Sequence, residues 1–241
     1  MRRRIRILEA ARQCIQQGGA ESLSLKAIAK MAEVSVATLY NLFGSKEGIL
    51  VTLLVQTIES FRERFHSSDI QAGLSSDRGG QVDSLSEIAI EEFVADEYFY
   101  RELLKSLQQM EVRIHLNGLV GLCVDLGEPI IRRMIASGDL LDVVSPRVLS
   151  HQLFMNFVHA VQLWSSGVSS SDQFRTQVAH SQCLLLAGIA SEAYRAKLHE
   201  RLRELDREML DFSDQQPVPP TELIETGIPV SSNAPIAQGV L

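Results

Sequence analysis

Residues 24–46 read SLKAIAKMAEVSVATLYNLFGSK, and this stretch predicts two short helices joined by a tight turn. Ser24 and Ser35 each stand at an N-cap position, immediately before apolar residues that recur at helical spacing. The spacing predicts a first helix over about 25–32 and a second over about 36–42. Two short helices in this order form a helix-turn-helix motif.

The second helix of the motif presents a small, polar and uncharged outer face if Leu39 and Phe43 point into the core. Such a face fits the major groove of DNA, where methyl groups contact thymine and hydroxyl or amide groups reach bases and phosphates. Three-helix packing of this kind also occurs in purely structural domains, so the pattern alone leaves both interpretations open. The candidate DNA-contacting residues of this helix and its cap are Ser35, Val36, Ala37, Thr38, Tyr40 and Asn41.

A further helix should begin directly after the motif, because Gly44 ends the second helix and Ser45 caps the next. Lys46 falls in the first turn of that helix, where a cation opposes the helix dipole by roughly 0.3 to 1 kcal/mol. A phosphate held against the helix N-terminus would explain the lysine, since backbone N–H groups and Lys46 would bind the same anion. We therefore expect Lys46 to contact the DNA backbone, together with Ser24 and Lys26.

Four arginines lie close to the motif, in the segment from Met1 to Arg6. This segment leads into a helix that carries Ile5, Leu8, Ala11 and Ile15 on one face and ends at Gly18-Gly19. A run of charges is often only a solvated terminus, but a basic arm beside a DNA-reading helix commonly contacts phosphates or the minor groove. The candidate contacts in this arm are Arg3 and Arg4.

The charges are divided unevenly along the chain. Residues 1–50 carry eight Lys or Arg against four Glu, a net charge of +4, whereas the whole chain has a net charge of −7. The rest of the chain therefore carries −11. A basic head on an acidic body indicates that nucleic acid would meet only the first fifty residues.

The sequence resembles the TetR-type transcriptional regulators in this head. The resemblance spans about residues 5–54 and is carried by TLY-x-x-F-x-x-K-E, from Thr38 to Glu47. Two positions depart from the family pattern: Glu33 stands where glycine is usual, and Leu42 stands where an aromatic residue or histidine is common. Glu33 in a left-handed turn would cost about 1 kcal/mol and would place a carboxylate near DNA.

The resemblance implies an all-α fold. An N-terminal three-helix domain with the helix-turn-helix would bind DNA, and a C-terminal helical domain would bind ligand and dimerise. The boundaries expected are 1–46 for the DNA-binding domain, 47–212 for the effector-binding and dimerisation domain, and 213–241 for a Pro-containing tail that is expected to be disordered. The resemblance implies that the protein represses transcription and that a small molecule relieves this repression.

The body of the chain reads as helices throughout. An apolar stripe from Ile49 to Phe65 predicts a long helix that links the head to the body, followed by a polar loop over 67–81. Ser145-Pro146 starts an apolar helix, and a further helix is expected over about 172–210. Paired in two chains, these last two helices would form a four-helix bundle. A homodimer would present two reading helices about 34 Å apart to a pseudo-palindromic operator.

A ligand pocket is expected within the body, between the helices of residues 82–164, from the family resemblance. Any one of its apolar candidates is more often a core residue than a pocket residue, and the effector expected is an apolar or amphipathic small molecule. His151 and His159 share a face, but no acidic or thiol cluster joins them, so we expect no metal and no cofactor. The candidate lining residues are Phe99, Leu103, Leu107, Met110, Leu119, Leu122, Phe154, Phe157, His159 and Trp164.

Other functional classes fit the sequence less well. The chain has no Gly-rich phosphate loop, GxSxG, HExxH or paired-Cys motif, so no catalytic residues are assigned and an enzyme is not expected. The three cysteines are widely spaced in apolar runs and are expected to be reduced packing residues. No apolar run is long enough for a bilayer, which predicts a cytoplasmic protein without a membrane partner. The alternative that remains is a helical protein-interaction module that does not bind DNA.

Overall fold

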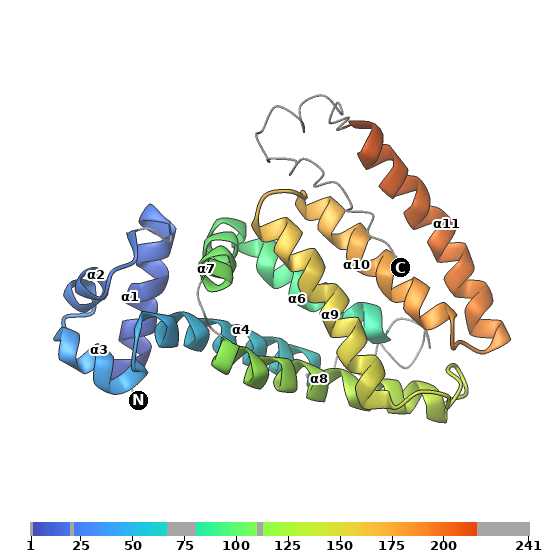
Figure 1. Ribbon diagram of the computed structural model, residues 1–241, viewed down its shortest axis with the longest axis horizontal. Helices are drawn as coiled ribbons and strands as arrows, with labels where there is room; N and C mark the ends of the chain where they lie inside the picture. Colours follow the sequence, from blue (N-terminus) through green and yellow to red (C-terminus); the bar gives the residue numbers. More distant parts are fainter. Residues whose placement is uncertain (1, 20–21, 67–80, 110–112, 216–241) are drawn as a thin grey trace, which may run out of the picture.

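The computed structural model describes residues 2–19, 22–66, 81–109 and 113–215 (Figure 1). Within these ranges the chain forms ten α-helices and no β-strand, which confirms the all-α prediction. The helices are α1 (Arg2–Gly18), α2 (Leu25–Met31), α3 (Val36–Phe43), α4 (Lys46–His66), α6 (Gln81–Ala95), α7 (Glu97–Gln109), α8 (Arg113–Ala136), α9 (Pro146–Ser165), α10 (Ser171–Ala187) and α11 (Glu192–Gln215).

The head consists of α1, α2 and α3, and its local structure follows the predicted capping. The Ser24 Oγ accepts a hydrogen bond from the Ala27 N–H at 3.1 Å, and the Ser35 Oγ accepts one from the Thr38 N–H at 3.2 Å. Each cap satisfies one of the free N–H groups at the start of its helix. The helix-turn-helix predicted from the sequence is therefore confirmed. The side chains packed between the three helices include Ile7, Leu8, Ala11, Ile15, Ile28, Ala29 and Leu39.

The N-terminal arginines lie within a helix, which differs from the predicted arm. Helix α1 begins at Arg2, so these residues form its first turns rather than an arm that precedes it. Of the predicted apolar stripe, Leu8, Ala11 and Ile15 are buried, but Ile5 is 45% exposed and Ile7 takes its place in the core. Ile7 lies one helical turn before Ala11 and two turns before Cys14, and this buried face sets the rotation of the helix.

Helix α4 joins the head to the body, as the apolar stripe predicted (Figure 1). It packs against α1 and α3 at its start and against α6, α7 and α8 farther along. Its 21 residues make a rod about 30 Å long. Both ends of this rod therefore belong to the same rigid element.

The body is built around a cluster of aromatic rings. The ring of Phe93 on α6 lies 5.6 Å from that of Phe61 on α4 and 6.1 Å from Trp164 on α9, measured between centroids. Trp164 also stacks on Phe174 of α10 at 5.4 Å, and its Nε1 donates to the Ser171 Oγ at 3.0 Å. Helix α9 is thus covered by neighbours on several sides, in keeping with its largely apolar sequence.

The helix predicted over 172–210 is two helices, which corrects that expectation. Helix α10 ends at Ala187, the chain turns, and α11 begins at Glu192 and packs back along α10 (Figure 1). Arg195 holds the turn, because its guanidinium donates to the carbonyl oxygens of Ala187 at 3.0 Å and Ala190 at 2.7 Å. These bonds satisfy carbonyl groups that an unbroken helix would have paired internally.

Two predicted segments fall largely outside the described residues, namely the loop over 67–81 and the tail over 213–241, of which Ser213 to Gln215 belong to α11. Among the helices that the structure describes, none combines the length and the apolar character that crossing a membrane requires.

Candidate nucleic-acid interface and ligand cavity

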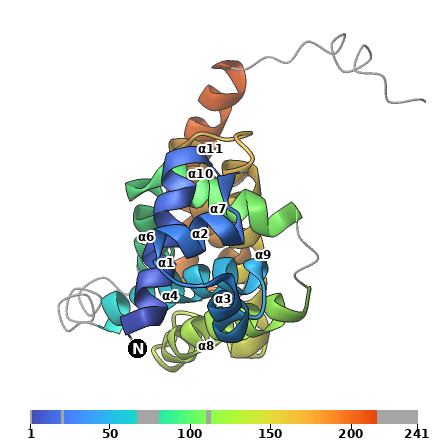
Figure 2. The ribbon, with the colours of Figure 1, turned by 90° about the vertical axis from the view of Figure 1, so that its left-hand side faces the viewer.

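The outer face of α3 carries the predicted base-contacting side chains. Ala37 and Asn41 are exposed, and Tyr40 is 53% exposed. Thr38 is half-buried, and its hydroxyl lies 2.9 Å from the Ser35 hydroxyl. Helix α3 lies at the end of the molecule that is turned toward the viewer in Figure 2. It offers methyl, hydroxyl and amide groups without a charged side chain, as a major-groove surface requires.

The start of α4 lies beside this face. Gly44 takes a φ of 76° and closes α3, and the Ser45 Oγ accepts a hydrogen bond from the Gly48 N–H at 3.1 Å. Hydrogen bonding to the Ser45 side chain also lowers the pKa of Glu47. Lys46 is half-buried in the first turn, where the free N–H groups of the helix lie. Lys46 thus lies at the N-terminus of α4, and its contact with a phosphate stays a prediction.

The arginines of α1 lie in different environments. Arg4 points onto α3: its Nη1 donates to the Leu42 carbonyl at 3.3 Å, and its guanidinium lies 4.6 Å from the centre of the Phe43 ring. This contact supports the end of α3, so Arg4 has a structural partner within the head. Arg3 is exposed, as are Ser24 and Lys26 at the start of α2.

A large cavity lies in the body between α4, α6, α7, α8 and α9, with a volume of about 760 Å³. This size is within the range of small-molecule sites. Of the predicted lining residues, Leu107, Leu119, Phe154, Phe157 and His159 line it.

The remaining predicted lining residues lie elsewhere. Phe99, Leu103 and Trp164 are buried in the packing of the body and are not among the residues that line the cavity. Leu122 lines a separate hollow near Ile58. Met110 lies outside the described residues.

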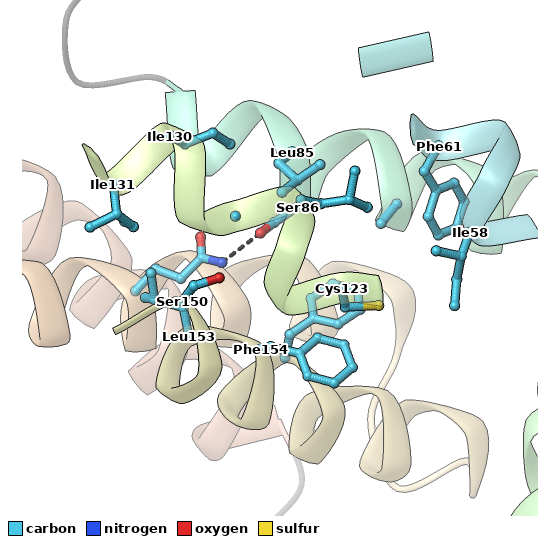
Figure 3. A pocket seen from close by; sticks show the side chains of 15 residues that line it. Ile58, Phe61, Leu85, Ser86, Cys123, Ile130, Ile131, Ser150, Leu153 and Phe154 are labelled. Carbon is cyan, nitrogen blue, oxygen red and sulfur yellow. Dashed lines mark hydrogen bonds between the residues drawn. The ribbon is translucent and has the colours of Figure 1, made fainter. Parts of the chain in front are cut away.

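A second, smaller cavity of about 100 Å³ adjoins the first (Figure 3). The two cavities share walls formed by Ile58 and Phe61 of α4, Cys123 of α8, and Phe154 and Phe157 of α9. Burial raises the pKa of the Cys123 thiol to about 12, so this group is protonated at neutral pH. Among the described residues that line the two cavities, none is Lys, Arg, Asp or Glu. The cavities therefore suit a neutral molecule.

The smaller cavity contains polar groups that the sequence analysis did not select, namely Ser86, Ser150 and Gln182. The Ser150 Oγ donates to the Val124 carbonyl at 2.9 Å, and the Gln182 Nε2 donates to the Ser86 Oγ at 2.5 Å, drawn as a dashed line in Figure 3. The available signal was a glutamine directly before the apolar run CLLLAGIA. That signal does not show whether the amide faces a cavity or solvent.

Helix α4 is tied to the body by a polar contact beside the cavities. The hydroxyl groups of Thr57 on α4 and Tyr100 on α7 lie 3.2 Å apart, and the Tyr100 hydroxyl donates to the Glu92 carboxylate on α6 at 3.1 Å. Burial raises the pKa of Tyr100. The cavity walls and this contact therefore use the same stretch of α4, the helix that begins at Lys46.

Comparison with known proteins places the head in a family. Residues 7–53 match the model of the family described as bacterial regulatory proteins, tetR family. UidR of Escherichia coli strain K12, an HTH-type transcriptional regulator, is 42% identical over 62 residues, which are 26% of this chain and 32% of that protein. KstR of Rhodococcus jostii strain RHA1, an HTH-type transcriptional repressor, is 40% identical over 62 residues, 26% of this chain and 29% of that protein. The chain thus spans about a third of the length of the curated relatives it matches.

Solved structures match a larger part of the chain at low sequence identity. The fatty acid degradation regulator FadR from Bacillus halodurans covers 76% of this chain and 94% of its own, with a TM-score of 0.59 and 20% identity. FadR from Bacillus subtilis, solved in complex with stearoyl-CoA, covers 77% and 98%, with a TM-score of 0.58 and 20% identity. These likenesses extend the shared fold from the head into the helical body. The head thus matches the tetR family of bacterial regulatory proteins over residues 7–53, and the solved structures share their fold with 76% to 77% of the chain.

Proposed function

We propose that the chain is a DNA-binding transcriptional repressor that binds a pseudo-palindromic operator as a homodimer and is released by a neutral, apolar or amphipathic small molecule. The observation that carries this proposal is the placement of α4. Its first residue, Lys46, lies at the proposed DNA surface, and Ile58 and Phe61 of the same helix form walls of both cavities. Ile58 lies about 18 Å along the helix from Lys46.

DNA recognition would divide between the elements of the head. The exposed face of α3 would enter the major groove, where Ala37 and Thr38 can contact bases and Tyr40 and Asn41 can reach phosphates. Lys46 and the N–H groups of the α4 start would hold a backbone phosphate. The match of this segment to named regulators and repressors supports the assignment.

Dimerisation would use α10 and α11, together with the end of α9. The structure supports this with exposed apolar side chains on the outer helices, including Leu184 at 54% and Leu210 at 65% exposed. Single exposed leucines are ordinary on a protein surface, and the assignment rests chiefly on the family resemblance. Two heads carried by such a dimer would address half-sites one turn of DNA apart, roughly 34 Å.

The effector would bind in the two adjoining cavities of the body. Two neighbours with the same fold are described as complexes with stearoyl-CoA and lauroyl-CoA, so acyl groups are bound by proteins of this architecture. In this chain the described cavity walls carry no Lys or Arg that would hold phosphate groups. A neutral molecule is therefore the better fit to these walls.

Release would follow from a difference in effector affinity between two conformations. If the cavities bind the effector better when α4 is tilted, occupancy shifts the chain toward that conformation. A tilt of α4 moves Lys46 and the adjoining α3, and so changes the separation of two heads in a dimer. The factor by which DNA affinity falls can be no larger than the ratio of the effector affinities for the two conformations.

Selection of binding sites from random duplex DNA tests the proposal directly. The full chain is incubated with the library without effector, and the enriched duplex is then titrated over a salt series. We expect an inverted repeat that is bound with a steep salt dependence. Folded protein that enriches no sequence, or that binds a protein partner without salt dependence, would favour the helical interaction module instead.

A further inference from the structure

The structure assigns Gln182 as the recognition group for an effector hydroxyl, and this deeper assignment rests on the proposed function of the cavities. Gln182 on α10 is 3% exposed and lines the smaller cavity. Its Oε1 has no hydrogen-bond partner among the described residues, and it is the one buried side-chain oxygen or nitrogen in that part of the chain left so. We propose that the ligand is a neutral, largely apolar molecule that carries a hydroxyl group.

The neighbouring hydrogen bonds leave the Gln182 oxygen without a donor. The amide nitrogen of Gln182 already donates to the Ser86 Oγ at 2.5 Å, which fixes the amide against α6. The Ser150 hydroxyl directs its only proton to the Val124 carbonyl at 2.9 Å, so it does not donate to this oxygen. An unpaired buried carbonyl oxygen destabilises the folded chain, because it has lost its hydrogen bonds to water. A ligand hydroxyl that donates to the Gln182 Oε1 would remove this cost.

The rest of the wall selects for an apolar molecule. The smaller cavity is otherwise lined by carbon-rich side chains, including Leu85, Ile130, Ile131 and Leu153 (Figure 3). No described residue of this wall carries a charge, so a carboxylate or ammonium group would be desolvated without a counterion. The shared wall at Cys123 and Phe154 leads toward the larger cavity, where the apolar part of the ligand would lie.

The position of Gln182 gives the contact a regulatory meaning. Gln182 belongs to α10, whereas Ile58 and Phe61 on the same cavity belong to α4. A hydroxyl held by Gln182 would fix one end of the ligand to α10, and the apolar part would then press on the walls that α4 supplies. The ligand would thus act between the helix proposed for dimerisation and the helix that begins at the DNA surface.

Two isomeric probes test the inference by calorimetric titration of the full chain. The alcohol n-octanol donates and accepts hydrogen bonds, whereas heptyl methyl ether has the same formula and only accepts them. We expect the wild-type chain to bind n-octanol about tenfold more tightly than the ether, because only the alcohol pairs with the Gln182 oxygen. Equal binding of the two probes by the wild-type chain would overturn the assignment, whatever a variant does.

Gln182→Leu and a matched variant show whether the preference for the alcohol arises at Gln182. Gln182→Leu should bind both probes with equal affinity, since the acceptor is gone and the side-chain volume is nearly kept. Gln177→Leu is the control, because Gln177 lies on the same helix but lines neither of these cavities. It should keep the tenfold preference, and circular dichroism should show the helical content of both variants. A preference that persists in Gln182→Leu would show that another group selects the hydroxyl.

The proposed function is tested separately, by measuring the DNA affinity of the chain with and without each probe. A preference for the alcohol without any loss of DNA affinity would support the role of Gln182 and contradict effector-controlled release. Binding of both probes with equal affinity, accompanied by DNA release, would support effector-controlled release and contradict the role of Gln182. If neither probe binds, the cavities are not an effector site and both proposals fail.

Discussion

The guanidinium of Arg12 on α1 lies 2.7 Å from the carboxylate of Asp96, where α6 gives way to α7. The Gln16 amide also donates to this carboxylate at 2.7 Å, and the Arg12 guanidinium lies 4.1 Å from the centre of the Phe99 ring. Because α1 belongs to the head and α7 to the body, this contact joins the two independently of α4. The head thus has a second attachment besides the helix that enters the body.

Arg12→Ala should loosen the head from the body. The ion pair and the cation–π contact are partly exposed, so we expect a loss of unfolding free energy of about 1 kcal/mol. The larger effect should be on coupling: the weakening of DNA binding by n-octanol should shrink severalfold, because a looser head follows the body less closely. DNA titrations with and without the probe measure this. Arg201→Ala, which breaks only the Arg201–Glu204 pair on α11, should keep the full effect.

Lys46→Ala should weaken DNA binding on all sequences alike. Loss of one phosphate contact removes one counterion release, so the slope of log affinity against log salt should fall in magnitude by about one. Lys105→Ala removes the same charge from an exposed site on α7 and should leave the slope unchanged. An unchanged slope in Lys46→Ala would refute the assignment of Lys46 to a phosphate.

Glu33 occupies the helix-turn-helix turn with a φ of 52°, in the left-handed region that favours glycine. Glu33→Gly should therefore raise the unfolding free energy, by up to about 1 kcal/mol, because it relieves this strain. It should also tighten DNA binding, since a carboxylate leaves the DNA-facing side. Glu33→Gln separates the two effects, with tighter DNA binding expected but no gain in stability. Denaturant unfolding and DNA titration of both variants give the answer.

Gly48 should be intolerant of a side chain. A Cβ at this position would overlap the carbonyl oxygen of Phe43, the last residue of α3. Gly48→Ala should cost about 1 to 3 kcal/mol of unfolding free energy and reduce DNA affinity, since α3 and α4 must move apart.

Gly118→Ala provides the matched comparison for Gly48→Ala. A Cβ at the exposed Gly118 of α8 meets no atom within 4 Å, so this variant should gain about 0.5 to 1 kcal/mol. Similar unfolding curves for the two variants would show that the junction between α3 and α4 is less constrained than described.

Cys123 should contribute stability that depends on pH. The unfolded thiol ionises near its ordinary pKa of 9.0, whereas burial raises the folded pKa to about 12. The protonated thiol of the folded chain therefore contributes fully below pH 9, and this contribution is lost progressively as the pH rises toward 12. The stability advantage of wild type over Cys123→Ala should shrink between about pH 8 and about pH 10. Val120→Ala, on the same helix beside the larger cavity, should show no such change.

The sequence predicted those features that depend on neighbouring residues. The caps at Ser24 and Ser35 are local hydrogen bonds within one helical turn, and so the helix-turn-helix could be inferred without any tertiary contact. The break between α10 and α11 has only a weak local signal, Gly188 directly after α10, because the apolar pattern continues at Ile189. Arg195 on the next helix holds the turn by reaching back to its carbonyl groups, a contact that the pattern does not reveal.

The cavities show a second limit of inference from sequence. Leu103 and Leu107 stand one helical turn apart on α7 with the same chemistry, yet Leu103 is buried in the core and Leu107 lines the larger cavity. Whether a leucine fills space or borders a hollow is decided by side chains from other helices. The same holds for Gln182, whose partner Ser86 lies 96 residues earlier in the chain.

The central claim is that filling the cavities of the body loosens the head from DNA, and a single titration tests it most directly. The full chain is titrated with its selected duplex at increasing n-octanol, while the fluorescence of Trp164, the only tryptophan of the chain, reports occupancy. Trp164 stacks on Phe93, which lines the larger cavity. We predict that DNA affinity falls in step with the fluorescence change. A saturated fluorescence change with DNA affinity unaltered would contradict the claim.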